Sequence, residues 1–483
     1  MQHKGKKIFS ELSTFFKNKD NSDAIFSLSR VLDGLRFSTK DLGYEKRHNC
    51  KFTALQTLQL LILFPFFSIG NAMNYPGSAL GRLFTCNKDM FYNLMKKDSI
   101  DWRRLVYRIS MCLIRRLEVR SDSRGKDAAP VCLVIDDTDF PKTGRRAEML
   151  GRVFSHVAMR SILGFKGLFM GRTDGKTFTL LDCSLHGEMG KNPNKPQGIS
   201  KKAASERYAK ERDMDSPAQA RKAECLTSKI AAAVAMVKRA ISQGVRFDYL
   251  LVDSWFTCAE LVQLVTSRHI RCHLLGMIKM GKTRYRVEGK EMTAKAIVDC
   301  QSKRKQIKRS RALRCHYCTV DAVFAGRRVR LFFFRFGKSD KWRGLITTDM
   351  CLSAMKAYRI YAQRWTIEVC FHECKSLLGM GRCQCRDFSS QIAALSVVMI
   401  QYNVLAFVKR FEAYETIGGL FRQVSAQTLE LTVAERVWLL IKELLTSISV
   451  LVDVDIDQLI EAIITENDKI NCFAAALCSR EVA

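Results

Sequence analysis

The segment VCLVIDDTDFPKTG (131–144) limits the possible folds more than any other part of the sequence. Its first five residues are apolar without polar alternation, which predicts a strand that is buried on both faces, as in a sheet covered by helices. Three carboxylates, Asp136, Asp137 and Asp139, follow within four positions. Because like charges repel one another at the end of a buried strand, their clustering needs a compensating partner.

A second segment, FDYLLVDSWF (247–256), repeats the pattern, since its buried strand also ends in a carboxylate, Asp253. If the two strands are parallel neighbours, their carboxyl ends lie about 5 Å apart. Sites in open α/β sheets form at that edge, and two aspartates there can share a divalent cation. Helix capping or turn formation would explain either aspartate alone, but the coincidence of two strengthens the interpretation as a metal site.

The sequence between these strands predicts an antiparallel hairpin and a crossover helix. Asp174-Gly175 separates two apolar runs, which is a strong hairpin signal. Ser216 and Pro217 are suited to begin a helix, which we expect to run to Gly244. The middle of the chain is therefore predicted to be a mixed α/β core, over residues 126–279 and 347–412.

The flanking segments have different patterns. Residues 1–125 show apolar residues at helical spacing with basic residues between them, which predicts a helical domain that binds DNA or serves only as a scaffold. Residues 280–346 alternate in polarity and predict a β-rich insertion. The C-terminal region, 413–483, is expected to be helical.

The insertion carries the run KRKQIKRSRALR (303–314), in which seven of twelve residues are basic. We expect Lys303, Arg304 and Lys305 to contact phosphates, although a solvated strand face would have a similar pattern. The whole chain has 79 Lys and Arg against 48 Asp and Glu, a net charge of +31. Such an excess favours a polyanionic partner, most commonly nucleic acid.

Other classes fit less well. The sequence has no basic amphipathic anchor for a membrane surface, and its apolar stretch 58–70 is too short for a span and contains Pro65. The N-terminal segment lacks the apolar region of a secretion signal. The 18 cysteines of the whole chain are scattered through apolar runs, as is typical of free thiols in a reducing compartment. We therefore expect a cytoplasmic protein without membrane association.

One polar stripe is expected on the helix predicted over 358–382. At about 100° per residue, Tyr361 and Lys375 fall within about 20° of Glu368, and Arg364 within about 40°. Apolar residues occupy the adjoining face. A solvated helix surface with an Arg364–Glu368 pair is the simplest alternative, but it leaves Tyr361 and the apolar surroundings unexplained.

These four residues are similar to a known signature. Tyr361-x2-Arg364-x3-Glu368-x6-Lys375 resembles the Tyr–Arg–Glu–Lys motif of insertion-sequence-4-like DDE transposases, and IDDT and VDSWF resemble that family's two acidic motifs. The likeness covers about 130–412 and, more loosely, the helical N-terminal region. It implies an α/β, ribonuclease-H-like core with a mixed sheet. Trp255 departs from the small residue that many members have after the second aspartate.

The resemblance also implies a catalytic site. The family motif has its first aspartate directly before threonine, which selects Asp137, with Asp253 and Glu368 as the other two carboxylates. Their hard oxygens suit Mg²⁺ or Mn²⁺. Two such ions can activate water for attack on a phosphodiester and stabilise the leaving 3′ oxygen. The freed 3′-OH can then attack a second phosphodiester, which is strand transfer. Asp136 would be structural.

The family further implies double-stranded DNA as the partner, both the terminal inverted repeats and the target, with a dimer in the synaptic complex and a cytoplasmic, nucleoid-associated location. Arg364 and Lys375 would clamp phosphates, and Tyr361 would donate to a phosphate or stack on a base. Trp255 is expected among the DNA contacts. Two alternatives are a metal-dependent nuclease that cuts without joining and a DNA-binding protein without catalysis. The second is disfavoured because all three acidic candidates are present.

Overall fold

The computed structural model describes residues 31–32, 34–35, 38–46, 50–120, 129–188, 192–268, 270–337, 339–411 and 416–426. The chain forms two compact units, one of Met95–Phe407 and one that combines the residues up to Leu94 with those from Val408. All the motifs singled out above for catalysis lie in the larger unit.

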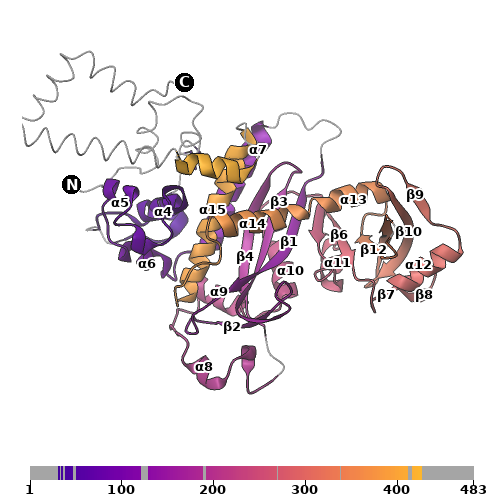
Figure 1. Cartoon of the computed structure of the whole chain (residues 1–483), viewed down its shortest axis with the longest axis horizontal. Helices are drawn as coiled ribbons and strands as arrows, with labels where there is room; N and C mark the ends of the chain where they lie inside the picture. The colour runs from indigo at the N-terminus through magenta and orange to yellow at the C-terminus, as the bar shows by residue number, and fades with distance from the viewer. Residues whose placement is uncertain are drawn as a thin grey trace, which may run out of the picture. The chain divides into compact units, whose positions relative to one another are not determined.

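The larger unit is built on a mixed sheet (Figure 1), which has 12 strands among the described residues, in the order β2-β3-β1-β5-β6-β12-β11-β10-β7-β8 with β4 beside β3 and β9 beside β10. The strands are β1 Cys132–Pro141, β2 Gly151–Ser155, β3 Arg160–Thr173, β4 Phe178–His186, β5 Tyr249–Val252, β6 His273–Ile278, β7 Arg284–Val287, β8 Lys290–Thr293, β9 Lys308–Ser310, β10 Cys315–Phe324, β11 Arg327–Phe336 and β12 Arg343–Thr347.

The described helices of the smaller unit and its border are α3 Thr39–Leu42, α4 Ala54–Leu63, η1 Phe64–Phe67, η2 Ala72–Asn74, α5 Ala79–Leu83 and α6 Asp89–Met95. Those that follow are α7 Trp102–Arg120, η3 Pro196–Gly198, α8 Lys201–Ser205, α9 Pro217–Glu224, α10 Lys229–Ser242, α11 Ala259–Val265, α12 Ala294–Lys303, α13 Ala354–Ala362, α14 Trp365–Leu377 and α15 Phe388–Phe411.

The centre of the sheet has the predicted ribonuclease-H-like arrangement. Strands β4, β3 and β1 are antiparallel neighbours, the first two joined by the predicted Asp174-Gly175 hairpin. Beyond β1 the pairing changes, because β1, β5 and β6 are parallel. The two apolar segments VCLVI and YLLV are thus adjacent parallel strands, and their residues from Cys132 to Ile135 and from Leu250 to Val252 are fully buried. The expected fold class is confirmed.

Helices cover both faces of this centre (Figure 1). Leu133 and Ile135 of β1 belong to one core with residues of α10 and α11. The alternate residues of β1 face the opposite side, where α13 and α14 lie. A side chain on β1 is therefore assigned to one face or the other by its position in the strand.

Strand β1 is longer than the apolar run predicts. It pairs with β3 through Pro141, whereas its parallel partner β5 ends at Val252. Asp136, Asp137 and Asp139 therefore lie within a strand, and the neighbours Asp136 and Asp137 point to opposite faces. The carboxylates do not form one group after the strand, as the sequence suggests, because pairing with β3 keeps the backbone extended.

Two predicted helices are each divided in two. The crossover helix breaks between α9 and α10, where the side chain of Ser228 accepts a hydrogen bond from the amide of Ala231 and caps α10. The helix predicted over 358–382 breaks between α13 and α14. Arg364, at this break, keeps helical backbone angles (φ −55°, ψ −32°), so the polar residues on the two helices still face the same side of the sheet.

The flanking regions also differ from the predicted boundaries. Helix α7 packs on β4, where Ser110 Oγ donates to the Leu180 carbonyl at 2.9 Å. Residues 95–120 therefore pack with the core, although the sequence places them in the helical domain 1–125. Segment 280–346 contains β7–β12 and α12 and continues the central sheet through β12, which pairs with β6.

The predicted C-terminal helical region lies mostly outside the described residues, of which 417–426 are helical. Within the described part of the chain, one helix, α15, is long and apolar enough to cross a membrane, and 94% of its apolar window is buried inside the protein. The apolar stretch 58–70 contributes to α4 and η1.

Candidate active site

Asp136 and Asp253 lie side by side at the carboxyl end of the parallel strands. Ile135 pairs in register with Val252, so the residues that follow them occupy neighbouring positions, about 4.8 Å apart between strand axes. A turn fixes Asp253, whose Oδ1 accepts hydrogen bonds from the amides of Trp255 at 2.9 Å and Phe256 at 3.0 Å. The expected meeting of two strand-end aspartates therefore occurs, with Asp136 as the first of them.

The surroundings of Asp136 are poorly suited to a negative charge. The pKa of its carboxyl is raised to about 7, and burial is the largest cause. Arg364 and a hydrogen bond from the Asp137 amide lower this pKa, whereas the nearby charges of Asp253 and Asp137 raise it. A crowded and buried carboxylate of this kind is stabilised by a nearby cation.

Arg364 supplies positive charge in this structure. Its Nη1 donates to Asp136 Oδ2 at 2.7 Å, and its Nη2 donates to Glu368 Oε1 one helical turn further along. The guanidinium therefore joins a strand carboxylate to the carboxylate of α14. The carboxylate of Glu368 contacts Arg364, so the pair that the alternative of a solvated helix surface also predicts is present.

The other two members of the predicted stripe line the same region. Tyr361 is 9% exposed, and its hydroxyl has no hydrogen-bond partner among the described residues. Burial is the main cause that raises its pKa, so the hydroxyl stays protonated and able to donate. Lys375 Nζ donates to Thr138 Oγ1 at 2.6 Å, and burial lowers the pKa of its ammonium.

Asp137, which the family motif selects, lies apart from this cluster. It occupies the other face of β1, where Lys229 of α10 forms an ion pair with its Oδ2. The same ammonium lies 4.0 Å from the ring centroid of Trp255. Because neighbouring side chains on a strand point to opposite faces, only one of Asp136 and Asp137 can reach Arg364 and Glu368.

Asp139 is also committed elsewhere, since it forms an ion pair with the buried Lys166 across the β1–β3 pair. The functional candidate that the sequence interpretation left aside is thus Asp136. The signal that identifies Asp136 is the parallel alignment of LVID (133–136) with LLVD (250–253). This alignment matches Asp136 to Asp253 without reference to a family motif.

A divalent cation fits the chemistry of this donor set. Asp136, Asp253 and Glu368 offer hard carboxylate oxygens, which suit Mg²⁺ or Mn²⁺. The guanidinium between Asp136 and Glu368 occupies a place where these carboxylates require positive charge. Among the described residues, no three His, Cys, Asp or Glu side chains are close enough to hold an ion together, and Arg364 lies between Asp136 and Glu368.

The remaining predicted contacts lie outside the acidic cluster. Trp255 follows β5, is 37% exposed and packs its ring edge-on against Phe256. Lys303, Arg304 and Lys305 are exposed at the end of α12, within the insertion. Arg304 is paired there with Glu288, through contacts of 2.7 and 2.8 Å.

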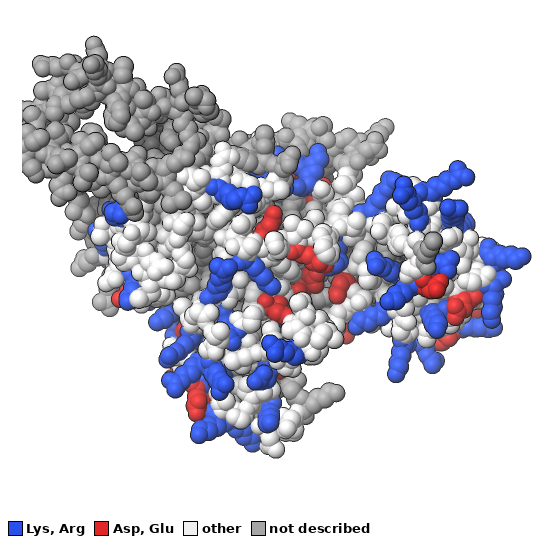
Figure 2. All heavy atoms as spheres, in the orientation of Figure 1, with Lys and Arg blue, Asp and Glu red and all other residues white. Residues whose placement is uncertain are grey.

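The charges form a pattern on the face that carries α13 and α14. Acidic side chains gather in the middle of this face, near β1 and α13, and lysines and arginines dominate on both sides of them (Figure 2). A buried group of carboxylates with basic surroundings suits a polyanionic substrate whose reacting group is brought to bound metal.

Comparison with known families agrees with this geometry. Residues 87–287 match the family described as DDE superfamily endonuclease, and residues 223–404 match the family described as Transposase DDE domain. No curated protein matches the chain. Among solved structures, the chain is similar to a piggyBac transposase in a synaptic complex with hairpin DNA, at 12% identity and a TM-score of 0.39, over 87% of this chain and 83% of that one.

The two family matches overlap and between them include β1, β5 and α14, the three elements that hold the carboxylates. The two matches support an enzyme that cleaves and joins DNA.

Proposed function

We propose that this enzyme is an insertion-sequence-4-like transposase that cuts DNA at the ends of its own element and joins the freed ends to target DNA. The observation that carries the proposal is the convergence of Asp136, Asp253 and Glu368 from two strands and a helix around Arg364. The spacing of Tyr361, Arg364, Glu368 and Lys375 supports the particular group.

In this proposal the three carboxylates would hold two Mg²⁺ or Mn²⁺ ions. Bound divalent ions supply an activated water and charge stabilisation for phosphodiester cleavage and transfer. Asp136 must be deprotonated to serve as a ligand, and its pKa of about 7 allows this near neutral pH. Asp137 keeps its ion pair with Lys229 and takes no part in metal binding.

The basic residues and the tyrosine of the stripe act on the DNA. Arg364 is able to exchange its two carboxylates for a phosphate, since planar guanidinium groups bind both with paired hydrogen bonds. This exchange frees Asp136 and Glu368 for metal as DNA arrives. The Tyr361 hydroxyl, which has no partner among the described residues, donates to a phosphate oxygen. Lys375 holds a neighbouring phosphate beside Thr138.

The partners in this function are double-stranded DNA with terminal inverted repeats, target DNA, and a second copy of the chain in the synaptic complex. The enzyme acts in the cytoplasm, on the nucleoid. Trp255 and the insertion residues Lys303 and Lys305 provide additional DNA contacts around the acidic cluster.

The test begins with the DNA that borders the coding region, where a pair of inverted repeats is expected. Purified protein is incubated with a labelled duplex that contains one repeat, with Mg²⁺ or with a chelator. We expect cleavage at the repeat's end and joined products when target DNA is added. Cleavage without joined products would indicate a nuclease. Binding without cleavage would indicate a DNA-binding protein, and either outcome would contradict the proposal.

A further inference from the structure

A basic site separate from the acidic cluster lies on the larger unit, beyond the end of β1. A cavity of about 310 Å³ opens between the β1–β2 connection and the α14–α15 connection. The first connection contributes Lys142, Arg145 and Arg146, and the second contributes Cys385 and Arg386. Among the residues that the structure describes, no carboxylate lines the cavity, whose lining is therefore positively charged.

The arginines of this cavity are available to a ligand. Arg145, Arg146 and Arg386 are exposed, and none of them forms an ion pair within the described part of the chain. Lys142 is different, because it is only 8% exposed and its Nζ donates to the carbonyls of Gly381 at 2.9 Å and Cys383 at 2.6 Å. Lys142 thus fixes the loop and adds a buried positive charge at the base of the cavity.

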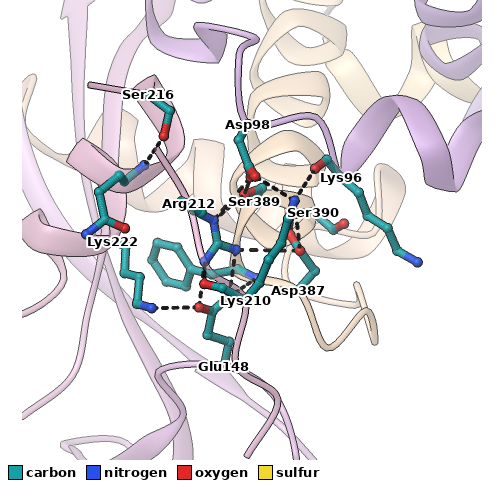
Figure 3. A network of polar contacts seen from close by, with 12 residues as sticks. Lys96, Asp98, Glu148, Lys210, Arg212, Ser216, Lys222, Asp387, Ser389 and Ser390 are labelled. Carbon is teal, nitrogen blue, oxygen red and sulfur yellow. Dashed lines mark hydrogen bonds and ion pairs between the residues drawn. The ribbon is translucent and has the colours of Figure 1, made fainter. Parts of the chain in front are cut away.

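Two neighbouring acids would cancel this charge if they faced the cavity, but they are bound elsewhere. Glu148 accepts two hydrogen bonds from Arg212, at 2.6 and 2.7 Å, and an ion pair from Lys222 at 2.9 Å. Asp387 lies 3.5 Å from the same guanidinium. Figure 3 shows these acids grouped around Arg212, whose side chain is fully buried.

The same network holds the two walls of the cavity together. The amide of Glu148 donates to the carbonyl of Arg386 at 2.8 Å, which links the β1–β2 connection directly to the α14–α15 connection. Because the link and the ion pairs are buried, the arginines project from a fixed frame. A preformed, uncompensated group of guanidinium ions is a binding site for phosphate oxygens.

We propose that this cavity binds a backbone phosphate of the DNA that is held at the acidic cluster. Asp136 and Lys142 are six residues apart along an extended strand, which corresponds to about 20 Å, or about six base pairs of duplex at 3.4 Å each. Lys375 lies beside Thr138, between the two sites. The inference rests on the proposed function, because it assigns the ligand as the same DNA duplex.

Such a contact adds affinity and fixes the path of the duplex without reading base sequence. Three arginines that contact phosphates should contribute up to about 2.7 units to the slope of log affinity against log salt. Loss of the contacts should therefore affect every DNA sequence equally, provided that the duplex is long enough to reach the cavity.

Cys385 offers a probe of occupancy that does not depend on cleavage. A hydrogen bond from Cys383, the largest cause, lowers the pKa of its thiol to about 7, against the opposing effect of burial. At pH 8 the thiolate should react with iodoacetamide. Cys351, which is exposed in the loop between β12 and α13, is the control thiol in the same molecule.

The experiment uses the full-length protein and two duplexes that contain the element's end, one extending at least 12 base pairs on both sides of the cleaved bond and one cut to about four. With the long duplex, alkylation of Cys385 should slow at least tenfold while Cys351 is unaffected. The triple variant Arg145→Ala, Arg146→Ala and Arg386→Ala should bind the long duplex at least tenfold more weakly, with a flatter salt slope. Both proteins should bind the short duplex equally.

Arg268→Ala is the matched control, because Arg268 is an exposed arginine that follows α11. An unchanged salt slope in the triple variant, or equal alkylation of Cys385 with and without long DNA, would overturn the inference. So would protection of Cys385 by inorganic phosphate or ATP at the same concentration of phosphate groups as DNA, since the cavity would then be a site for free anions. If the DNA protects Cys385 but is never cut, the inference stands and the proposed function fails.

Discussion

Two buried groups of charged residues on the same sheet have opposite electrostatic character. On β4, the fully buried Asp182 is approached by Arg103 and Arg239, each at 2.8 Å, and by Arg221 at 3.9 Å. Glu224 shares these arginines, so three cations surround two acids. On β1, Asp136 has Arg364 as its ion-pair partner and adjoins Asp253, while Glu368 binds the same guanidinium.

Burial disfavours the charged form of both aspartates and is the largest influence on the pKa of each, yet the net shifts of the two pKa values have opposite signs. The surrounding arginines lower the pKa of Asp182, whereas the pKa of Asp136 rises to about 7. The sign of the surplus charge decides the outcome. Around Asp182 the arginines outnumber the acids, and their ion pairs hold α7, α9 and α10 against β4. Around Asp136 the carboxylates outnumber the cations, so this site requires a further cation.

The largest expected effect is on stability, from Asp182→Asn. This change leaves three arginines around a neutral group, and breaking a buried ion pair on one side costs about 3–5 kcal/mol. Urea unfolding should show a loss of this size, whereas Asp136→Asn should not lower the free energy of unfolding. Equal losses in the two variants would mean that both groups serve the same structural purpose.

The pH dependence of stability should separate the two aspartates further. Asp182 has a lowered pKa when folded, so its contribution is present above its unfolded pKa of about 3.9 and is lost as the pH falls through the folded value. Asp136 has a raised pKa, so the folded state holds a proton that the unfolded state releases, and stability falls as the pH rises from about 4 to about 7. In metal-free buffer, Asp136→Asn should flatten this fall, which is a few kcal/mol at most. An identical pH profile for the variant and the wild type would remove the distinction.

Arg364→Ala should affect ligands rather than stability. Loss of its phosphate contact should weaken capture of the cleaved DNA end by about 1.5–3 kcal/mol, or roughly ten- to hundredfold. Without DNA, the same variant should bind Mn²⁺ more tightly, because the guanidinium no longer competes for Asp136 and Glu368. Gel shift and calorimetry measure the two effects. Arg359 is an exposed arginine on α13, and Arg359→Ala is the control. If Arg364→Ala binds DNA and Mn²⁺ as Arg359→Ala does, this assignment of Arg364 is contradicted.

The smallest expected effect concerns the exposed charges of the insertion. Joint neutralisation of Lys303, Arg304 and Lys305 should flatten the log–log salt slope of DNA affinity by up to about three units. The pairing of Arg304 with Glu288 makes a value nearer two more consistent with the structure. A slope equal to that of the wild type would show that these residues form only a solvated surface.

The sequence predicts the central fold well because its signals are local. Apolar runs, the Asp174-Gly175 turn and the Ser216-Pro217 helix start are each contained within a few residues, and each corresponds to an observed element. The breaks at Ser228 and Arg364 are less visible, because helical periodicity continues across them. Helix α7 is assigned to the core by its packing on β4, which composition does not reveal.

The structure brings together the residues of the predicted stripe, but it places Asp136 rather than Asp137 beside Arg364. Glu368, Arg364, Tyr361 and Lys375 share a helical face that angular spacing identifies. The choice between Asp136 and Asp137 depends on which face of β1 meets α14, and an apolar run buried on both faces contains no such information. Pairing of β1 with β5, between segments more than 100 residues apart (249−132=117), supplies it.

Single-turnover cleavage by Asp136→Asn and Asp137→Asn, side by side with wild type on the element's end in Mg²⁺, tests the central claim most directly. The loss of a metal ligand removes several kcal/mol of transition-state stabilisation, so Asp136→Asn should lower the rate roughly a thousandfold or more while DNA binding survives. Asp137→Asn should retain most of the activity, because its loss breaks only the ion pair with Lys229. If Asp136→Asn cuts at the normal rate and Asp137→Asn does not, the metal site is on the other face of β1 and the assignment of Asp136 is contradicted.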